Sequence, residues 1–184
     1  SASDIDTNAD GATDVHVADM DGDGDLDIVS SSEVDDTIAW YENDGASDPS
    51  WSAANIDTNA DGARRVFVAD MDNDGDMDIL SASSNDNTIA WYENDGASDP
   101  SWTASDIATD ALAARSVFAA DMDNDGDMDV ISASCNDDAI AWYENLGDTD
   151  DDGNLDWTAA DIDTNADCAF GVFAADIDSD GDMD

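Results

Sequence analysis

Short apolar runs alternate with polar segments along the whole chain, and the runs recur in a fixed order. In one stretch of the sequence they span residues 66–70, 77–81, 88–93 and 102–107. Each run is too short for a typical helix and is rich in Val, Ile, Phe, Trp or Tyr, which favours β-strands. Asn, Asp, Gly and Ser separate the runs and indicate turns. The pattern therefore predicts four strands, which we term a to d.

The four-strand pattern returns with a period of 51 residues, as the spacing of Asp19, Asp70 and Asp121 shows. The next copy begins at Asp176, 55 residues further on, because the third copy carries an insertion of four residues. Four strands in about 50 residues are typical of a propeller blade. We therefore predict an all-β fold, a β-propeller built from four-stranded antiparallel blades.

The period divides residues 1–184 into a single repeat array of about three and a half blades. That number of blades cannot close a ring, so either the chain is a fragment of a longer polypeptide, which we favour, or several chains complete the structure. The predicted units are 1–51, 52–102, 103–157 and a partial unit 158–184.

A nine-residue acidic segment joins strands a and b in every unit. Asp stands at its positions 1, 3, 5, 7 and 9, and Gly stands at position 6. Calcium takes about six to eight oxygen ligands at about 2.3–2.6 Å, and a short loop supplies them when alternate residues point inward. We interpret positions 1, 3, 5 and 9 as side-chain ligands and position 7 as a backbone-carbonyl ligand. The predicted metal-binding residues are Asp19, Asp21, Asp23, Asp25, Asp27, Asp70, Asp72, Asp74, Asp76, Asp78, Asp121, Asp123, Asp125, Asp127, Asp129, Asp176, Asp178, Asp180, Asp182 and Asp184.

A solvated acidic turn is the alternative for any single segment. Carboxylates at close range repel one another, however, and four copies in the same register favour a bound cation. An EF-hand is excluded, because position 12 is Ser30, Ser81 or Ser132 instead of Glu and because β-branched runs follow the loops.

The charge balance restricts the partners of the chain. It carries 49 Asp and Glu residues against 3 Lys and Arg residues, a formal net charge of −46. This charge disfavours nucleic acid and anionic membranes and favours multivalent cations or basic partners. Hydrophobic residues make up 41% of the chain and include six Trp, which argues for a folded core instead of disorder. No apolar run approaches the roughly 18 residues of a membrane span, so we expect no membrane insertion.

The Asp-x-Asp-x-Asp-Gly-x-x-Asp segment between two strands, repeated once per unit, resembles the FG-GAP/VCBS repeat family. That family includes the calcium-binding blades of integrin α-subunit propellers and of secreted microbial proteins, some of them lectins. The resemblance covers essentially the whole chain and implies a β-propeller with Ca²⁺ as its cofactor. The Phe-Gly signature of the family is weak here, with Phe170-Gly171 as the one Phe-Gly pair.

The insertion in the third unit creates a further acidic segment. Its residues Asp148, Asp150, Asp152, Asn154 and Asp156 fit the nine-position pattern, so it is either a fifth metal site or an acidic loop. The segment 6–14 fits as well, but its equivalents decay in later units, and we predict a turn there.

Two cysteines, Cys135 and Cys168, fall in neighbouring b–c and d–a loops, on the face expected to lie opposite the acidic segments. We expect a disulfide between them, with two free thiols as the alternative.

Three further sets of residues admit a structural interpretation. The pairs that begin at Trp40, Trp91 and Trp142 place Trp and Tyr on opposite faces of strand c, which predicts packing between blades instead of sugar stacking. His16 takes the position of Phe67 in the next unit, so we expect a strand residue and not a catalyst. The arginines are expected to pair locally with Asp instead of gripping an anionic ligand; they are Arg64, Arg65 and Arg115.

The leading functional hypothesis is an extracellular or cell-surface protein with a structural, adhesive or assembly role, in which Ca²⁺ stabilises each a–b hairpin. A carbohydrate-binding lectin and a subunit of an extracellular filament are the alternatives. We expect self-association or binding to another extracellular protein or glycan. The sequence contains no nucleophile–His arrangement and calcium accounts for the carboxylates, so we do not expect an enzyme.

Overall fold

A computed structural model gives the structure of residues 4–150 and 153–184, with twelve β-strands in the part described. The strands are β1 (Ala12–Ala18), β2 (Asp27–Ser32), β3 (Thr37–Asn43), β4 (Trp51–Asp57), β5 (Ala63–Ala69), β6 (Asp78–Ser83), β7 (Thr88–Asn94), β8 (Trp102–Ala108), β9 (Ala114–Ala120), β10 (Asp129–Ser134), β11 (Ala139–Asn145) and β12 (Trp157–Asp163). They form three four-stranded antiparallel sheets in which consecutive strands are neighbours, β1–β4, β5–β8 and β9–β12. The predicted all-β fold with four-stranded blades is confirmed.

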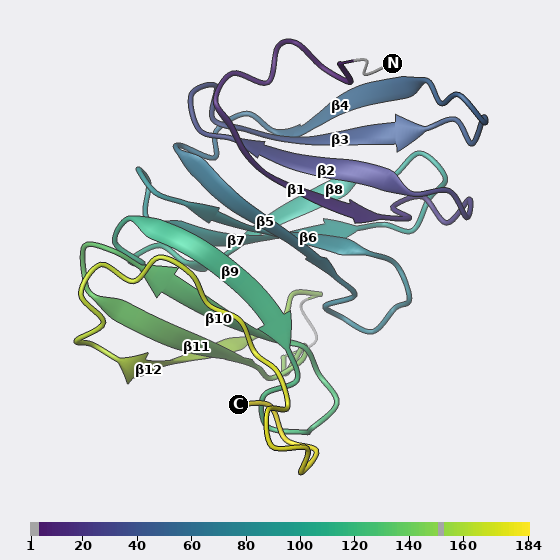
Figure 1. Ribbon diagram of the computed structural model, residues 1–184. Coiled ribbons are helices and arrows are strands. Elements are labelled where there is room, and N and C mark those ends of the chain that lie inside the picture. The colour runs from purple at the N-terminus through teal and green to yellow at the C-terminus, as the bar shows by residue number, and fades with distance from the viewer. Residues whose placement is uncertain (1–3, 151–152) are drawn as a thin grey trace.

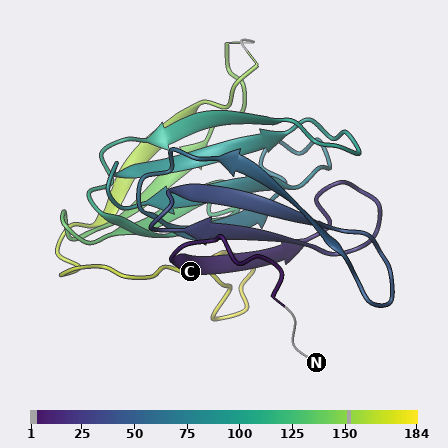
Figure 2. The same cartoon turned by 90° about the horizontal axis from the view of Figure 1, so that it is seen from above.

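The three sheets lie one after another as blades 1, 2 and 3 of a partial propeller (Figure 1). Their first strands, β1, β5 and β9, contact one another and form the inner edge of the array. Figure 1 shows the N-terminal and C-terminal ends of the chain at opposite ends of the array, and Figure 2 shows the overlapping sheets from above. In the fourth unit, residues 169–176 follow the course of an inner strand but are not paired as a strand.

An aromatic row runs along the inner edge and contains the single histidine. The ring centroids are 5.1 Å apart between His16 and Phe67, 4.6 Å between Phe67 and Phe118, and 4.7 Å between Phe118 and Phe173. His16 is therefore a strand residue that replaces Phe in this row, as its place in the repeat predicted.

The core lies between the blades, because each sheet is apolar on both faces. We name the two faces after strand c. The tryptophan face consists of Met20, Val29, Ile38 and Trp40 in blade 1, Met71, Leu80, Ile89 and Trp91 in blade 2, and Met122, Ile131, Ile140 and Trp142 in blade 3. The tyrosine face consists of Val15, Val17, Ile28 and Tyr41 in blade 1, Val66, Val68, Ile79 and Tyr92 in blade 2, and Val117, Ala119, Val130 and Tyr143 in blade 3.

The tryptophan faces of blades 1 and 2 pack against the tyrosine faces of blades 2 and 3. One core cluster joins Ile38 and Trp40 to Val66 and Tyr92, and a second joins Trp91 to residues of blade 3. Trp91 is 2% exposed, and its neighbours Leu80 and Ile89 are fully buried. The expectation that the Trp-Tyr pairs pack between blades is confirmed.

Replacing Trp91 tests how far the array depends on this packing. We expect Trp91→Ala to lower the free energy of unfolding by about 3–5 kcal/mol, because a large buried side chain is lost and a cavity remains. Urea denaturation followed by circular dichroism measures the change. Val34→Ala is the control, since Val34 is 64% exposed and its loss should cost at most about 0.5 kcal/mol. Equal stability of the two variants would contradict blade packing as the main source of stability.

Candidate metal centres

The predicted metal-binding residues lie in the loops between the first two strands of each blade. These loops join β1 to β2, β5 to β6 and β9 to β10, and the fourth lies at residues 176–184. Because the blades repeat the same orientation, their acidic loops share one face of the array (Figure 1).

Hydrogen bonds from the backbone to Asp side chains close each acidic loop. In the second loop, the amide of Gly75 donates to Oδ2 of Asp70 at 3.1 Å, and the amide of Asp74 donates to Oδ1 of Asp72 at 3.1 Å. Gly75 has a φ of +100°, a conformation that side chains strongly disfavour, which explains the glycine at position 6. The same sixth-to-first contact occurs in the other three loops, at 3.0 to 3.1 Å.

Loop closure brings carboxylates together. In each of four groups, one carboxylate oxygen from every residue lies within 4.8 Å of the others. Oxygens on opposite sides of a calcium ion, each about 2.3–2.6 Å away, are separated by about 5 Å, so the groups suit this cation. The groups are Asp19, Asp21 and Asp27; Asp70, Asp72 and Asp74; Asp121, Asp123 and Asp125; and Asp176, Asp178 and Asp184.

The predicted ligands at positions 1 and 3 thus converge in every loop. Position 5 joins them in the second and third loops, and position 9 joins them in the first and fourth. The remaining predicted side-chain ligands, Asp23, Asp78, Asp129 and Asp180, lie in the same loops but outside these tightest groups.

The Asp at position 9 fixes the loop to the third strand. Asp78 is 1% exposed, and its Oδ2 accepts a hydrogen bond from the amide of Met71 at 3.0 Å. Its Oδ1 accepts one from the amide of Asn94, at the end of β7, at 2.8 Å. Asp27 and Asp129 make the equivalent pairs of bonds. This carboxylate therefore has a structural role in addition to its predicted role as a metal ligand.

In the third and fourth acidic loops, the Asp at position 7 accepts a hydrogen bond from the preceding loop. Oδ1 of Asp127 accepts a hydrogen bond from Nδ2 of Asn73 at 2.9 Å, and Asp182 accepts one from Asn124 at 2.7 Å. The donors stand at position 4 of the preceding acidic loop, so consecutive loops are linked directly. The predicted role of Asp25, Asp76, Asp127 and Asp182 as backbone-carbonyl ligands stays a prediction.

Asn94 and Asn145 are residues whose importance the sequence-based prediction missed. Nδ2 of Asn94 donates to the carbonyl of Met20 in blade 1 at 2.9 Å and to that of Met77 in its own blade at 3.0 Å. Asn145 makes the same pair of contacts with the carbonyls of Met71 and Met128. Each Asn therefore bridges two acidic loops. The invariant Tyr-Glu-Asn triplet at the end of strand c was the available signal.

The electrostatics of the second loop favour a cation. Burial raises the pKa of Asp78 from 3.8 to about 7, against the opposing effect of its amide hydrogen bonds and the nearby Trp91 indole. Burial, with the neighbouring charges of Asp74 and Asp70, also raises the pKa of Asp72. Oδ1 of Asp70 is buried without a hydrogen-bond partner. A carboxylate oxygen in this position lacks a proton donor and is suited to coordinate a metal ion.

The insertion in the third unit closes in the same way as the four regular loops. The amide of Gly153 donates to Oδ2 of Asp148 at 2.9 Å, and that of Thr149 donates to Oδ2 of Asp156 at 3.1 Å. These bonds reproduce the sixth-to-first and second-to-ninth contacts. Asp152 lies outside the described residues, and a fifth metal site at Asp148, Asp150, Asn154 and Asp156 stays a prediction.

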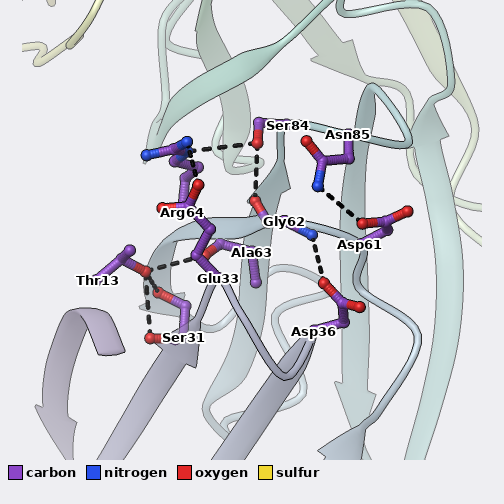
Figure 3. Close-up of polar contacts among 10 residues, drawn as sticks. All are labelled: Thr13, Ser31, Glu33, Asp36, Asp61, Gly62, Ala63, Arg64, Ser84 and Asn85. Carbon is purple, nitrogen blue, oxygen red and sulfur yellow. Dashed lines mark hydrogen bonds and ion pairs between the residues drawn. The ribbon is translucent and has the colours of Figure 1, made fainter. Parts of the chain in front are cut away.

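On the face opposite the acidic loops, an ion pair and hydrogen bonds connect neighbouring blades. Figure 3 shows the junction of blades 1 and 2, where Arg64 forms an ion pair with Glu33 and the amide of Gly62 donates to Oδ1 of Asp36 at 2.8 Å. At the end of the array, a disulfide joins Cys135 to Cys168.

The arginines follow the predicted local pairing in part. Arg65 lies 3.4 Å from a carboxylate oxygen of Asp14, as predicted. Arg64 pairs with Glu33 instead of Asp, and the guanidinium of Arg115 lies over the ring of Phe170, 5.4 Å from its centroid. The prediction of an Asp partner was wrong for Arg64, where Glu33 is the partner, and for Arg115, where the contact found among the described residues is the ring of Phe170.

A comparison with known protein families agrees with the repeat period and with the position of the acidic loops. The model of the FG-GAP-like repeat matches residues 19–81, 70–132 and 122–184. The chain belongs to the FG-GAP-like repeat family. No curated protein matches the sequence.

A solved structure of similar fold is that of a lectin from Agrocybe aegerita, described as recognising non-reducing terminal N-acetylglucosamine. The similarity has a TM-score of 0.54 at 18% sequence identity, and it covers 84% of this FG-GAP-like chain. The chain spans 39% of the length of the lectin, so the likeness supports the propeller-like fold. Within the part described, no helix could span a lipid bilayer.

The raised pKa of Asp78 predicts how stability depends on pH without metal. The folded chain binds a proton more tightly than the unfolded chain, so stability should rise as the pH falls from about 7 toward 3.8. Thermal melts in excess chelator measure this trend. Asp78→Asn should flatten it, whereas exposed Asp48→Asn should leave it unchanged. A metal-free chain that loses stability steadily over this interval would contradict the prediction.

Proposed function

We propose that the chain is a calcium-binding propeller protein in which the ions hold the acidic loops closed. The convergence of carboxylates in four loops carries the proposal, together with the buried, unpartnered Oδ1 of Asp70. Bound Ca²⁺ would offset the repulsion among these carboxylates and the cost of burying their charge. The proposed residues are those of the four acidic loops, with the insertion 148–156 as a fifth candidate.

We also infer a structural role instead of catalysis. The loops contact one another through Asn73, Asn94 and Asn145, so ions bound there would stabilise the junctions between blades as well as single hairpins. Exposed loops of this kind suit the high calcium concentration outside cells, which supports an extracellular or cell-surface location. Adhesion or assembly, with another protein or glycan as partner, fits such a role.

Calcium removal tests the proposal. A ligand at 100 times its Kd adds about 2.7 kcal/mol of stability per site, so saturating Ca²⁺ should raise the melting temperature strongly and excess chelator should reverse the rise. Differential scanning calorimetry measures the change. A melting temperature that changes with neither Ca²⁺ nor chelator would refute the proposed calcium sites.

Single substitutions separate metal binding from simple charge removal. Asp72→Asn should stabilise the metal-free chain slightly, because it relieves repulsion, and yet reduce the gain in stability that Ca²⁺ provides. Asp48→Asn removes the same charge from an exposed loop and should preserve the gain. If both variants respond alike, the calcium effect is general charge screening and not binding to these loops.

Carbohydrate binding is a second candidate, and a cavity in blade 3 favours it. The cavity has a volume of about 270 Å³, and Asp110, Asp137, Tyr143, Asp161 and Thr164 contribute polar groups to its lining. A smaller cavity of about 100 Å³ occupies the equivalent place in blade 1.

Two replacements in the repeat account for the larger cavity. In blade 2 the hydroxyl of Tyr92 donates to Asp57 at 3.0 Å. In the third unit Ala108 replaces Asp57, which removes that carboxylate. Ala139 replaces Thr88, so a smaller side chain lines the cavity. Hydroxyl and carboxylate groups around such a space suit the hydroxyls of a sugar.

A glycan array with the intact chain tests this second candidate. We expect binding of a limited set of glycans, and Ala108→Asp should abolish it by refilling the cavity with the carboxylate found in blade 2. Ala54→Asp, on exposed β4, is the control. Absence of binding, or binding that survives Ala108→Asp, would reject this cavity as a sugar site.

A further inference from the structure

The cavity in blade 3 contains a buried pair of hydroxyl groups, one of which lacks an acceptor for its proton. Oγ of Ser132 lies 3.3 Å from the hydroxyl oxygen of Tyr143, and the two side chains are 0% and 4% exposed. Tyr143 also lines the cavity. One contact between two hydroxyls uses one of their two protons, so the second proton requires another acceptor.

In blades 1 and 2 a carboxylate accepts this second proton. The tyrosine hydroxyls of β3 and β7 donate to Oδ2 of Asp6 at 3.2 Å and to Oδ2 of Asp57 at 3.0 Å. Ala108 stands at the equivalent position of blade 3. Within the part of the chain that the structure describes, the hydroxyl of Tyr143 has no hydrogen bond besides the contact with Ser132. A buried donor without an acceptor is unfavourable, so an oxygen atom of a ligand would be stabilised there.

The carboxylates around this cavity lie at other positions than in the neighbouring blades. Asp110, which precedes β9, replaces an Asn that stands at this position in both other blades. Asp161 on β12 replaces Asn55 of β4. Together with Asp137 they place three carboxylates in the lining, and the lining residues that the structure describes include no Lys, Arg or His. The cavity therefore has a negative charge that no basic side chain of its lining offsets.

The charges of these carboxylates reach the buried tyrosine. Burial raises the pKa of the Tyr143 phenol most, and the hydrogen bond with Ser132 opposes this rise. Three carboxylates raise it further; they are Asp110, Asp137 and Asp161. Oδ1 of Asp137 is itself buried and has no hydrogen-bond partner among the described residues. The cavity thus combines a hydroxyl proton without an acceptor and a carboxylate oxygen without a donor.

The spread of the carboxylates favours an organic cation over a metal ion. Among the described residues, the groups of three whose carboxylate oxygens lie within 4.8 Å of one another are all in the acidic loops. The three carboxylates of the cavity form no such group, so they do not converge on one small ion. An ammonium group that is part of a larger molecule can donate to them from inside the cavity.

We propose that the cavity of blade 3 binds a sugar that carries a primary ammonium group. A hydroxyl oxygen of the sugar accepts the free proton of the Ser132–Tyr143 pair, and the ammonium group donates to the surrounding carboxylates. The volume of about 270 Å³ has room for roughly nine water molecules of about 30 Å³ each, and hence for one sugar ring. This inference rests on carbohydrate binding, the second candidate function, and names the class of sugar.

Isothermal titration calorimetry of the intact chain with four small molecules tests the proposal. Saturating Ca²⁺ and about 0.15 M salt reduce general attraction of cations to the acidic surface, and a pH of about 6 keeps the amine charged. We expect glucosamine to bind about tenfold more tightly than glucose or N-acetylglucosamine, because these two rings lack the ammonium group. Ethylamine, which has the ammonium group without a ring, should bind more weakly than glucosamine.

Substitutions taken from the other blades test the contact with the ammonium group. Asp110→Asn restores the residue of blades 1 and 2, and Asp161→Asn restores that of blade 1, so the double variant should fold. It should lower the affinity for glucosamine about fivefold to tenfold and change that for glucose less than about twofold, because charge-assisted hydrogen bonds are lost. Asp48→Asn, in an exposed loop of blade 1, removes charge elsewhere and should leave both affinities unchanged.

The tyrosine hydroxyl is tested separately. Tyr143→Phe should weaken the binding of glucosamine and of glucose alike, about fivefold, because both rings offer an oxygen to this donor. Tyr92→Phe makes the same change in blade 2, away from the cavity, and should leave both affinities unchanged.

The four ligands distinguish failure of this inference from failure of the carbohydrate site. If glucosamine and the neutral sugars bind equally, or if the double Asn variant keeps the preference for glucosamine, the ammonium contact is wrong and carbohydrate binding stands. If no sugar binds, or if ethylamine binds as tightly as glucosamine, the carbohydrate site and this inference are both wrong.

Discussion

The structure depends on a buried carboxylate at the end of the acidic loop in each of the three blades. Asp78, like Asp27 and Asp129, receives a hydrogen bond from the start of its own loop and another from the end of the third strand. These bonds hold the loop in one conformation and tie it to the sheet. They also place a negative charge where burial disfavours it, as the raised pKa of Asp78 shows. The same residue therefore fixes the conformation of the loop and carries the charge whose burial is unfavourable.

Hydrogen bonds join the acidic loops into one connected system across the blades. Asn94 contacts the loops of blades 1 and 2, Asn145 contacts those of blades 2 and 3, and Asn73 reaches Asp127 directly. Apolar contact between tryptophan and tyrosine faces holds the same blades together beneath the loops. A change in the conformation of one acidic loop should therefore alter how the neighbouring blade packs.

The sequence was sufficient for the architecture because periodicity is a local and repeated signal. The period, the strand types, the two faces of strand c and the clustering of positions 1 and 3 all follow from spacing. Strand a was predicted from Val66, but β5 begins at Ala63, because a register shift between Ala63 and Arg65 extends the pairing. The spacing of apolar residues in the sequence does not reveal such a register shift.

The remaining features arise from contacts between distant residues. The amide bonds to Asp78, the bridging by Asn94 and the place of Arg115 over Phe170 all depend on how blades meet, so spacing within one unit cannot reveal them. The partial fourth unit also differs from its sequence pattern. Residues 169–176 have the composition of an inner strand but, within the part of the chain that the structure describes, no second strand pairs with them.

The two complete junctions differ in one link on the acidic face. Asn94 and Asn145 connect the acidic loops at both junctions. Gly22 in the first acidic loop has no side chain to reach Asp76, so the direct bond that Asn73 makes with Asp127 has no counterpart there. The ion pair of Arg64 with Glu33 instead adds a contact on the opposite face of the first junction. A force that separates the acidic loops would therefore meet less resistance between blades 1 and 2 than between blades 2 and 3.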